Sequence, residues 1–113
     1  MIKGIGVDII EIERIAKAIE NKAFVERIYT NAEIAEMMSS GNRAENYAGK
    51  YAAKEAISKA LGTGIGKVSF QDIEILHDDM GKPIAKIKDK DLIVHISISH
   101  SRENAVAYVI LEE

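Results

Sequence analysis

The chain contains no cysteine and no tryptophan, and it has one proline among its 113 residues. The lack of cysteine excludes a disulfide scaffold, a thiolate zinc site and a cysteine nucleophile, and we expect a cytoplasmic protein. Aromatic residues make up 5% of the chain, whereas hydrophobic residues make up 47%. This composition predicts a core of Ile, Val, Leu and Ala within regular helices and strands.

Long apolar runs and an excess of positive charge are also missing. No run approaches the ~20 residues that a membrane helix needs. Residues 1–10 are apolar but lack the basic leader and cleavage site of a signal peptide, so we expect no export and no membrane association. The formal net charge of -3 argues against general nucleic-acid binding, which needs clustered Lys and Arg. An anionic partner would therefore have to meet a local basic patch.

The length suits one domain with one core and is too short for two ordinary domains. We expect a single domain over residues 1–113, because the sequence contains no internal repeat, low-complexity segment or linker. A chain of this length buries a smaller fraction of its surface on folding than a longer chain does. Association between subunits would be a natural way to complete the core.

The amino terminus predicts a strand. Residues 1–9 alternate, with apolar side chains on one face and Gly4, Gly6 and Asp8 on the other, as in a strand with one packed face. Asp8 is the last residue on this face, and the glycines before it have no side chains. An acidic residue between a strand and a helix is also a common helix N-terminal cap, and the pattern by itself leaves that interpretation open.

Helices are predicted for the rest of the first half. Apolar periodicity indicates a short amphipathic helix from Ile12 to Ile19 and a second one from Phe24 to Ile28. Thr30 and Glu33 have the spacing of a capping box that opens a third helix. A long central helix is expected over 43–61, which is rich in Ala, Glu and Lys, with a stop at Gly62.

The second half predicts strands in two hairpins. In the first, residues 72–76 and 84–87 are joined by turn residues around Gly81. In the second, residues 92–99 and 105–111 are joined by a short polar turn. These elements indicate an α+β fold in which helices, one of them long and central, pack on a mainly antiparallel sheet.

Two charged residues on the central helix are candidates for chemistry. Glu55 and Lys59 lie four residues apart on one helical face, next to the loop that begins with Gly62 and continues through Gly64. One interpretation is that they face a polyphosphate held near this loop, the carboxylate through a metal ion. The alternative is an ordinary surface ion pair worth about 0.2 to 0.5 kcal/mol.

Three blocks of sequence, taken together, favour the chemical interpretation. They are Gly4-Ile5-Gly6-Val7-Asp8, then Ala53-Lys54-Glu55-Ala56 with Lys59-Ala60-Leu61-Gly62-Thr63-Gly64, and finally His95-Ile96-Ser97-Ile98-Ser99-His100-Ser101. In this order they resemble the 4'-phosphopantetheinyl transferases, and the short length resembles the branch that primes acyl carrier proteins of fatty-acid synthesis. The resemblance runs from about residue 2 to residue 112 and implies the fold of that family.

The resemblance implies a magnesium site. Asp8 and Glu55 match the family's Mg²⁺ ligands, whose shell is completed by phosphate oxygens of coenzyme A and by water. This agrees with the preference of Mg²⁺ for a few carboxylates together with phosphates and retained waters. Lys59 and the turn from Gly62 to Gly64 match residues beside the pyrophosphate.

Further coenzyme A contacts are implied at three other positions. Lys50 matches a basic contact with coenzyme A that can be Arg in relatives. Lys supplies a single point charge there, whereas Arg could form two parallel hydrogen bonds. The turn with Gly81 belongs to the same site, although Met80 stands where relatives can carry an Asn that contacts the adenosine. His100 matches a histidine near the substrate, but it also continues an apolar strand face, so a hydrogen-bonded structural histidine is an equal alternative.

The implied reaction is attack by a serine hydroxyl of the carrier protein on the β-phosphorus of coenzyme A. The metal ion would bridge the phosphates, and Lys59 would stabilise the leaving 3',5'-adenosine bisphosphate. Three acceptors of the serine proton stay open: Glu55, a metal-bound water and His100.

Carrier docking is implied for Arg14 and Arg27, which match basic positions that hold the acidic recognition helix of the carrier. Their alternative is solvated arginine on an amphipathic helix. Ala23 replaces a residue that can be basic in relatives. The resemblance also implies a homotrimer with active sites between subunits.

Two other functions compete with transfer. One is a catalytically silent module that binds carrier proteins or nucleotides, which predicts that Asp8 and Glu55 can be neutralised without effect. The other is a different metal-dependent phosphate enzyme, such as a nuclease. The acidic charge balance argues against a nuclease.

Overall fold

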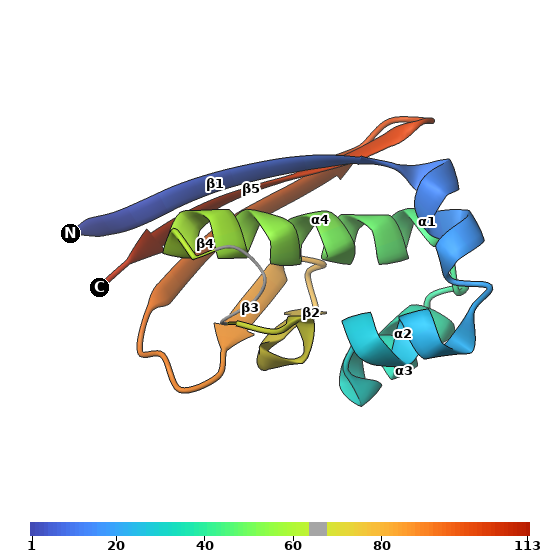
Figure 1. The fold of residues 1–113 in the computed structure, drawn as a ribbon, viewed down its shortest axis with the longest axis horizontal. Coiled ribbons are helices and arrows are strands. Elements are labelled where there is room, and N and C mark those ends of the chain that lie inside the picture. Colours follow the sequence, from blue (N-terminus) through green and yellow to red (C-terminus); the bar gives the residue numbers. More distant parts are fainter. Residues whose placement is uncertain (64–67) are drawn as a thin grey trace.

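The computed structural model describes residues 1–63 and 68–113, and it confirms the α+β class (Figure 1). The region of the first predicted hairpin contains three short elements, which are the 3-10 helix η1 (Phe70–Asp72), the strand β2 (Ile73–His77) and the strand β3 (Pro83–Ile87). The other elements, in chain order, are β1 (Ile2–Glu11), α1 (Ile12–Ala18), α2 (Lys22–Ile28), α3 (Asn31–Ser39), α4 (Ala44–Leu61), β4 (Ile93–His100) and β5 (Asn104–Glu112).

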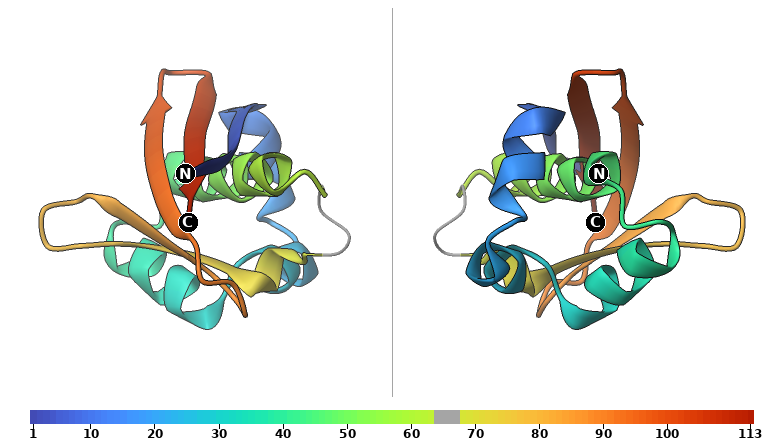
Figure 2. Two further views of the ribbon diagram at one scale, coloured as in Figure 1. Left: turned by 90° about the vertical axis from the view of Figure 1, so that its left-hand side faces the viewer. Right: turned by 90° about the vertical axis from the view of Figure 1, so that its right-hand side faces the viewer.

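The molecule is built in layers around α4. A three-stranded antiparallel sheet, with the order β1-β5-β4, covers one side of α4. The helices α2 and α3 and the two-stranded β2–β3 sheet lie on the opposite side of α4 (Figures 1 and 2). None of the described helices is long and apolar enough to cross a membrane.

Local sequence signals begin and end these elements as predicted. The Thr30 side chain accepts from the backbone N–H of Glu33, and the Glu33 side chain accepts from that of Thr30, which completes the capping box of α3. Gly62 ends α4 with φ +78°, and Gly81 turns the β2–β3 hairpin with φ +84°. Both angles are in the left-handed region that favours glycine.

The packed face of β1 is its glycine face. A Cβ atom added to Gly4 would lie 1.9 Å from the carbonyl oxygen of Ala60, and one added to Gly6 would lie 1.9 Å from that of Ala56. The strand therefore rests directly on the backbone of α4. Because side chains alternate along a strand, Asp8 also faces α4.

The opposite face of β1 is exposed, although it is the apolar one. Ile5, Val7 and Ile9 are 60%, 50% and 65% exposed, and Tyr108 on the adjacent strand is 46% exposed. The sequence indicated one packed face on this strand without showing which. The glycines decide it, because only a face without side chains lets the strand approach the helix backbone.

Candidate active site

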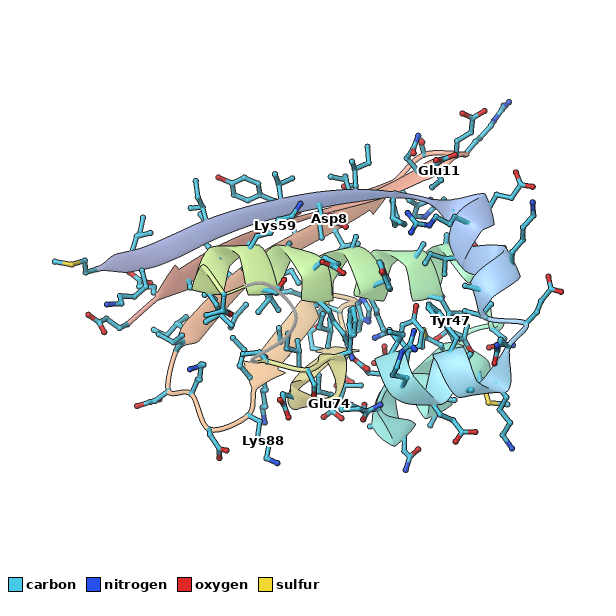
Figure 3. The ribbon with its side chains drawn as sticks, viewed as in Figure 1. Asp8, Glu11, Tyr47, Lys59, Glu74 and Lys88 are labelled. Atoms are coloured by element: carbon cyan, nitrogen blue, oxygen red, sulfur yellow. The ribbon has the colours of Figure 1, made fainter. Side chains whose placement is uncertain are left out.

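Asp8 and Lys59 meet between β1 and α4. The Lys59 Nζ atom lies 3.0 Å from Asp8 Oδ1 and donates a second hydrogen bond, also 3.0 Å long, to the carbonyl oxygen of Val7. Figure 3 shows the two side chains side by side in the gap between strand and helix. The Asp8 side chain is 16% exposed, whereas that of Lys59 is 53% exposed. Solvent, and hence a ligand, reaches this pair from the Lys59 side.

Two alternative interpretations were a helix cap for Asp8 and an ordinary surface ion pair of Glu55 with Lys59. Neither of them describes these residues. The helix α1 begins at Ile12 with Glu11 as its N-cap, so Asp8 is not a cap. Lys59 forms an ion pair with Asp8, which lies on another element. The packing of β1 on α4 brings these two chemical candidates together.

Glu55 completes the group one helical turn before Lys59. Burial raises the pKa of the Glu55 carboxyl, and the negative charge of Asp8 raises it further, while Lys59 and a hydrogen bond from Tyr51 act in the opposite direction. The two carboxylates therefore repel each other across a short gap. A cation bound between them would relieve this repulsion.

The donor set fits Mg²⁺ and does not form a closed protein cage. Across residues 1–63 and 68–113, no group of three or more His, Cys, Asp or Glu side chains could hold a metal ion. A metal ion between Asp8 and Glu55 would thus take its other ligands from phosphate and water. Mg²⁺ prefers this kind of site.

Three other predicted residues surround a separate cavity. Lys50, Gly81 and His100 line a hollow of about 160 Å³, together with Glu45, Asn46, Gly49, His77, Pro83 and Ile98. His100 is exposed, and its Nδ1 atom lies 3.3 Å from the carbonyl oxygen of Ser101. The residue is therefore exposed beside this cavity, and its role, contact with the substrate or a structural hydrogen bond, stays a prediction.

Lys50 lines this cavity, and its ammonium group is already hydrogen-bonded within the protein. Lys50 is 1% exposed; it donates to Glu36 Oε1 at 2.7 Å and to the carbonyl oxygen of Ile75. Two of the three donors of an ammonium group are thus used within the protein. A contact between Lys50 and coenzyme A stays a prediction, and at most one N–H is left to make it.

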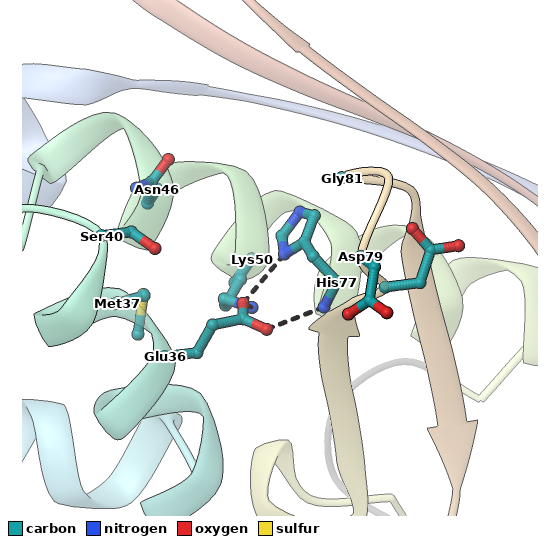
Figure 4. Close-up of a pocket in the computed structure, with 9 residues that line it drawn as sticks. Glu36, Met37, Ser40, Asn46, Lys50, His77, Asp79 and Gly81 are labelled. Carbon is teal, nitrogen blue, oxygen red and sulfur yellow. Dashed lines mark hydrogen bonds and ion pairs between the residues drawn. The ribbon is translucent and has the colours of Figure 1, made fainter.

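Glu36 links this lysine to a histidine that the sequence did not single out. The carboxylate accepts from the backbone N–H of His77 at 2.8 Å and lies 2.8 Å from the His77 Nδ1 atom (Figure 4). Burial works to raise the pKa of Glu36, but the hydrogen bonds from Lys50 and His77 outweigh it and lower the pKa to about 2. These three side chains border a second cavity of about 400 Å³, lined also by Met37, Ser40, Asn46, Asp78, Asp79 and Gly81.

Asp8 and His100 lie on the two edge strands of the three-stranded sheet, whereas Lys50, Glu55 and Lys59 lie on α4. Asp8 pairs with Ala107 on the central strand β5, and Ala107 pairs with Ile98 on β4, two residues before His100. Because adjacent strands are ~4.8 Å apart, the edge strands are roughly 10 Å apart. The helix α4 packs against both β1 and β5.

The two predicted docking residues, Arg14 and Arg27, lie near Tyr51, one helical turn before Glu55. Arg27 is exposed on α2, and its guanidinium carbon is 5.8 Å from the centre of the Phe24 ring, which in turn stacks on Tyr51 at 6.3 Å. Arg14 is exposed on α1. Burial and the charge of Glu55 raise the pKa of Tyr51, and the nearby charge of Arg14 opposes this rise. Both arginines thus lie near the residue one turn before Glu55.

Comparison with known proteins shows the family to which this chain belongs. The family model of the 4'-phosphopantetheinyl transferase superfamily matches residues 4–110, nearly the whole chain. The chain belongs to this superfamily. The match spans the predicted site residues, from Asp8 to His100.

Individual relatives narrow the family to the holo-[acyl-carrier-protein] synthases. The chain is 57% identical to the synthase of Bacillus mycoides over 116 residues, covering 99% of this chain and 97% of that protein. The synthase of a Geobacillus strain is 53% identical, with 99% and 98% covered. A crystal structure of the Bacillus anthracis synthase in complex with coenzyme A (3',5'-ADP) superposes with a TM-score of 0.89 at 54% identity, covering 100% of this chain and 98% of that one.

One buried charge pair of this transferase was missed by the sequence analysis. Lys54, the residue before Glu55, and Glu33, the third residue of α3, have fully buried side chains whose charged atoms are 2.6 Å apart. Glu33 was recognised only as part of a capping box. The available signal was the spacing of Lys50, Lys54 and Ser58, which recur every four residues on one face of α4 and are all buried.

The glycine turn after α4 is only partly visible in the structure. Gly62 lies at the exposed end of the helix, where a Cβ atom would meet nothing within 4 Å. Gly64 lies outside the described residues. The predicted roles of Gly62, Gly64 and Gly81 in holding coenzyme A stay predictions.

Proposed function

We propose that this chain transfers the 4'-phosphopantetheine group of coenzyme A to a serine of an apo acyl carrier protein, giving the holo carrier for fatty-acid synthesis. The observation that carries the proposal is the convergence of Asp8, Glu55 and Lys59 between β1 and α4, in a chain that belongs to the holo-[acyl-carrier-protein] synthases. The whole chain, 1–113, would act as one catalytic domain. The absence of cysteine makes the cytoplasm its expected compartment.

Asp8 and Glu55 would hold Mg²⁺. When bound there, the ion supplies positive charge to the diphosphate and stabilises the charge that develops during transfer. The serine oxygen forms a bond to the β-phosphorus while the bond from that phosphorus to the bridging oxygen breaks, and 3',5'-adenosine bisphosphate leaves. Lys59, which is half-exposed beside Asp8, supplies a mobile positive charge for the leaving phosphate.

The serine proton needs an acceptor at the same place. Glu55 lies in the group with Asp8 and Lys59, so it could take the proton directly or through a water held by the metal ion. His100 lines the other cavity, across α4. Within one chain Glu55 is therefore the favoured acceptor, and His100 would contribute from a neighbouring subunit.

A homotrimer would unite the two groups of residues. Each chain carries Asp8, Glu55 and Lys59 between β1 and α4 and a separate cavity with Lys50, Gly81 and His100, so a neighbour could place its cavity beside the first group. The exposed apolar face of the sheet supports such contacts; it is formed by Ile5, Val7, Ile9, Ile93 and Tyr108. A face of this kind on a soluble domain commonly marks a protein interface.

The oligomer is tested by native mass spectrometry of the wild-type chain and of Val7→Asp. We expect a trimer for the wild type and a folded monomer with little transfer activity for the variant, since a charge on the apolar face opposes association. Lys3→Ala, also on β1, serves as the matched control and should stay trimeric. A wild-type monomer that is fully active would overturn the trimer.

Carrier recognition would use Arg14 and Arg27. Both are exposed and lie near Tyr51, so an acidic helix bound across α1 and α2 would come close to Glu55. Such a local basic surface would let an acidic chain attract an acidic partner.

The transfer itself is tested by mass spectrometry of the carrier. The chain is incubated with Mg²⁺, coenzyme A and an apo acyl carrier protein, and the carrier is then weighed. We expect a gain equal to one phosphopantetheine group, and none when coenzyme A is omitted. A carrier that keeps its mass, while a control synthase modifies it, would overturn the proposal and favour a silent binding module.

A further inference from the structure

The helix α2, which carries Arg27, is too short to be stable by itself. It has seven residues, and isolated helices shorter than about 12 residues are marginal in water. Its chain leaves the helix at Tyr29 in an extended conformation. The last carbonyl groups of a helix have no intrahelical partner, so those of α2 need donors from elsewhere.

Gln71 supplies two of these donors from a distant part of the chain. Its Nε2 atom donates to the carbonyl oxygens of Glu26 and Tyr29, both at 2.7 Å. The carbonyl of Ile28, between them, accepts from Lys54 Nζ at 2.7 Å. The carbonyl oxygen of Arg27 is a third and more distant acceptor, 3.5 Å from Nε2. All of these partners are acceptors, so the Gln71 amide must point its nitrogen toward them. The end of α2 is thus held by side chains and not by its own sequence.

Ring contacts around Arg27 also connect α2 with η1. The guanidinium group lies over Phe24, which stacks on Tyr51, and Tyr51 stacks on Phe70 with ring centres 5.5 Å apart. Phe70 precedes Gln71 on η1, so Gln71 connects the two elements that enclose Tyr51. The backbone of Arg27 lies directly between carbonyl groups that are held by Gln71 and Lys54.

The Gln71 contact is also separate from the transfer site. Gln71 is exposed and is bonded to the backbone of α2, whereas Asp8 and Lys59 meet on the β1 side of α4. Losing the Gln71 amide would free the end of α2 without touching those two residues. Its effect should therefore fall on the partner that binds α2.

We infer that Gln71 is a positioning residue for recognition of the carrier protein: it holds the end of α2 so that Arg27 is presented in one place. The inference rests on the proposed function, with Arg27 as a docking residue. Without the two hydrogen bonds, α2 would sample several positions, and the carrier would have to order it on binding. That cost appears in the affinity for the carrier and not in the affinity for coenzyme A.

The test compares Gln71→Glu and Gln71→Ala with the wild type in steady-state transfer. Gln71→Glu keeps the size of the side chain but removes its N–H donors, so a role in filling space predicts no effect of this variant. We expect both variants to raise the KM for the apo carrier about tenfold, which matches the loss of one or two hydrogen bonds. The KM for coenzyme A and the value of kcat should stay within about twofold.

A double variant separates positioning from general destabilisation. If Gln71 acts through Arg27, then Gln71→Ala should add little to the KM for the carrier once Arg27→Ala is present. An unchanged KM for the carrier, an equal rise in both KM values, or additive effects in the double variant would overturn the inference. A wild-type chain that never modifies the carrier would instead overturn the proposed function, and with it this inference.

Discussion

Lys54 Nζ on α4 lies 2.6 Å from Glu33 Oε1 on α3, and both side chains are completely buried. Every charged atom of the pair has further partners. The ammonium group also donates to the carbonyl oxygens of Ile28 and Phe70, and the carboxylate accepts from the backbone N–H groups of Thr30 and Ile75. This network ties α2, α3, η1 and β2 to the residue that precedes Glu55.

Breaking one half of this pair should destabilise the fold strongly. We expect Lys54→Met to lower the free energy of unfolding by about 3 to 5 kcal/mol, because it leaves the Glu33 carboxylate buried without a counter-charge. Glu33→Gln should cost a similar amount for the converse reason. Urea unfolding followed by circular dichroism measures both.

The double variant Lys54→Met with Glu33→Gln is the control for this prediction. It buries no unpaired charge, so its cost should be clearly smaller than the sum of the two single costs. Strictly additive costs would show that the two charges do not stabilise each other.

Gly6 should tolerate no side chain. A Cβ atom there would lie 1.9 Å from the carbonyl oxygen of Ala56, and backbone cannot yield as a flexible side chain can. We expect Gly6→Ala to destabilise the protein by about 3 kcal/mol or more and to lower transfer activity, because Asp8 two residues later would move away from Lys59. Thermal unfolding and initial rates measure the two effects.

Lys3→Ala on the same strand is a suitable comparison for Gly6→Ala, since Lys3 is exposed and forms only a surface ion pair with Glu113 at 3.8 Å. This variant should keep near-normal stability and activity. A Gly6→Ala protein as stable and as active as Lys3→Ala would contradict the close packing of β1 on α4.

Glu36 should contribute stability that disappears in acid. Its pKa in the folded chain is about 2, below the ordinary value of 4.5, so the folded state favours the ionised form. The contribution is present in full above pH 4.5 and is lost as the pH falls toward 2. We therefore expect the stability difference between wild type and Glu36→Gln to be largest near neutral pH and to shrink over this range.

Urea unfolding of both proteins at a series of pH values tests this account of Glu36. The comparison removes the effect of the other carboxylates, which titrate in both proteins. A stability difference that stays constant from pH 6 to pH 2.5 would mean that Lys50 and His77 do not lower the pKa of Glu36.

Local sequence patterns predicted most of the elements. The capping box at Thr30 and Glu33 opens α3 as expected, because it depends on residues three apart. Gly62 and Gly81 mark turns because their backbone angles favour glycine. Asp8, Glu55 and Lys59 could be proposed together only through the family resemblance, since their approach depends on how β1 packs on α4.

Contacts between distant elements were the part that the sequence could not predict. The pairs of Glu36 with Lys50 and Glu33 with Lys54 use residue types that are usually solvated on helices. Burying such a charged side chain becomes favourable only when a neighbouring helix places a side chain of opposite charge within hydrogen-bonding distance of it. Periodicity on one helix contains no information about that partner.

The separation of the site into two groups has the same origin. Lys50, Gly81 and His100 come together around a cavity because β4 and the β2–β3 hairpin meet the start of α4. Asp8 and Lys59 meet between β1 and α4. Sequence order places all of them in one family pattern but does not show that they belong to two places on the chain.

The central claim is that Asp8 and Glu55 together hold the divalent ion used in phosphopantetheine transfer. The most direct test measures the initial rate of transfer to an apo acyl carrier protein against Mg²⁺ concentration, for the wild type, Asp8→Asn and Glu55→Gln. We predict a saturable dependence for the wild type and a loss of about 100-fold or more in each variant, the scale of removing one electrostatic contact from a transition state. A variant that keeps the wild-type rate and the wild-type Mg²⁺ dependence would contradict the claim.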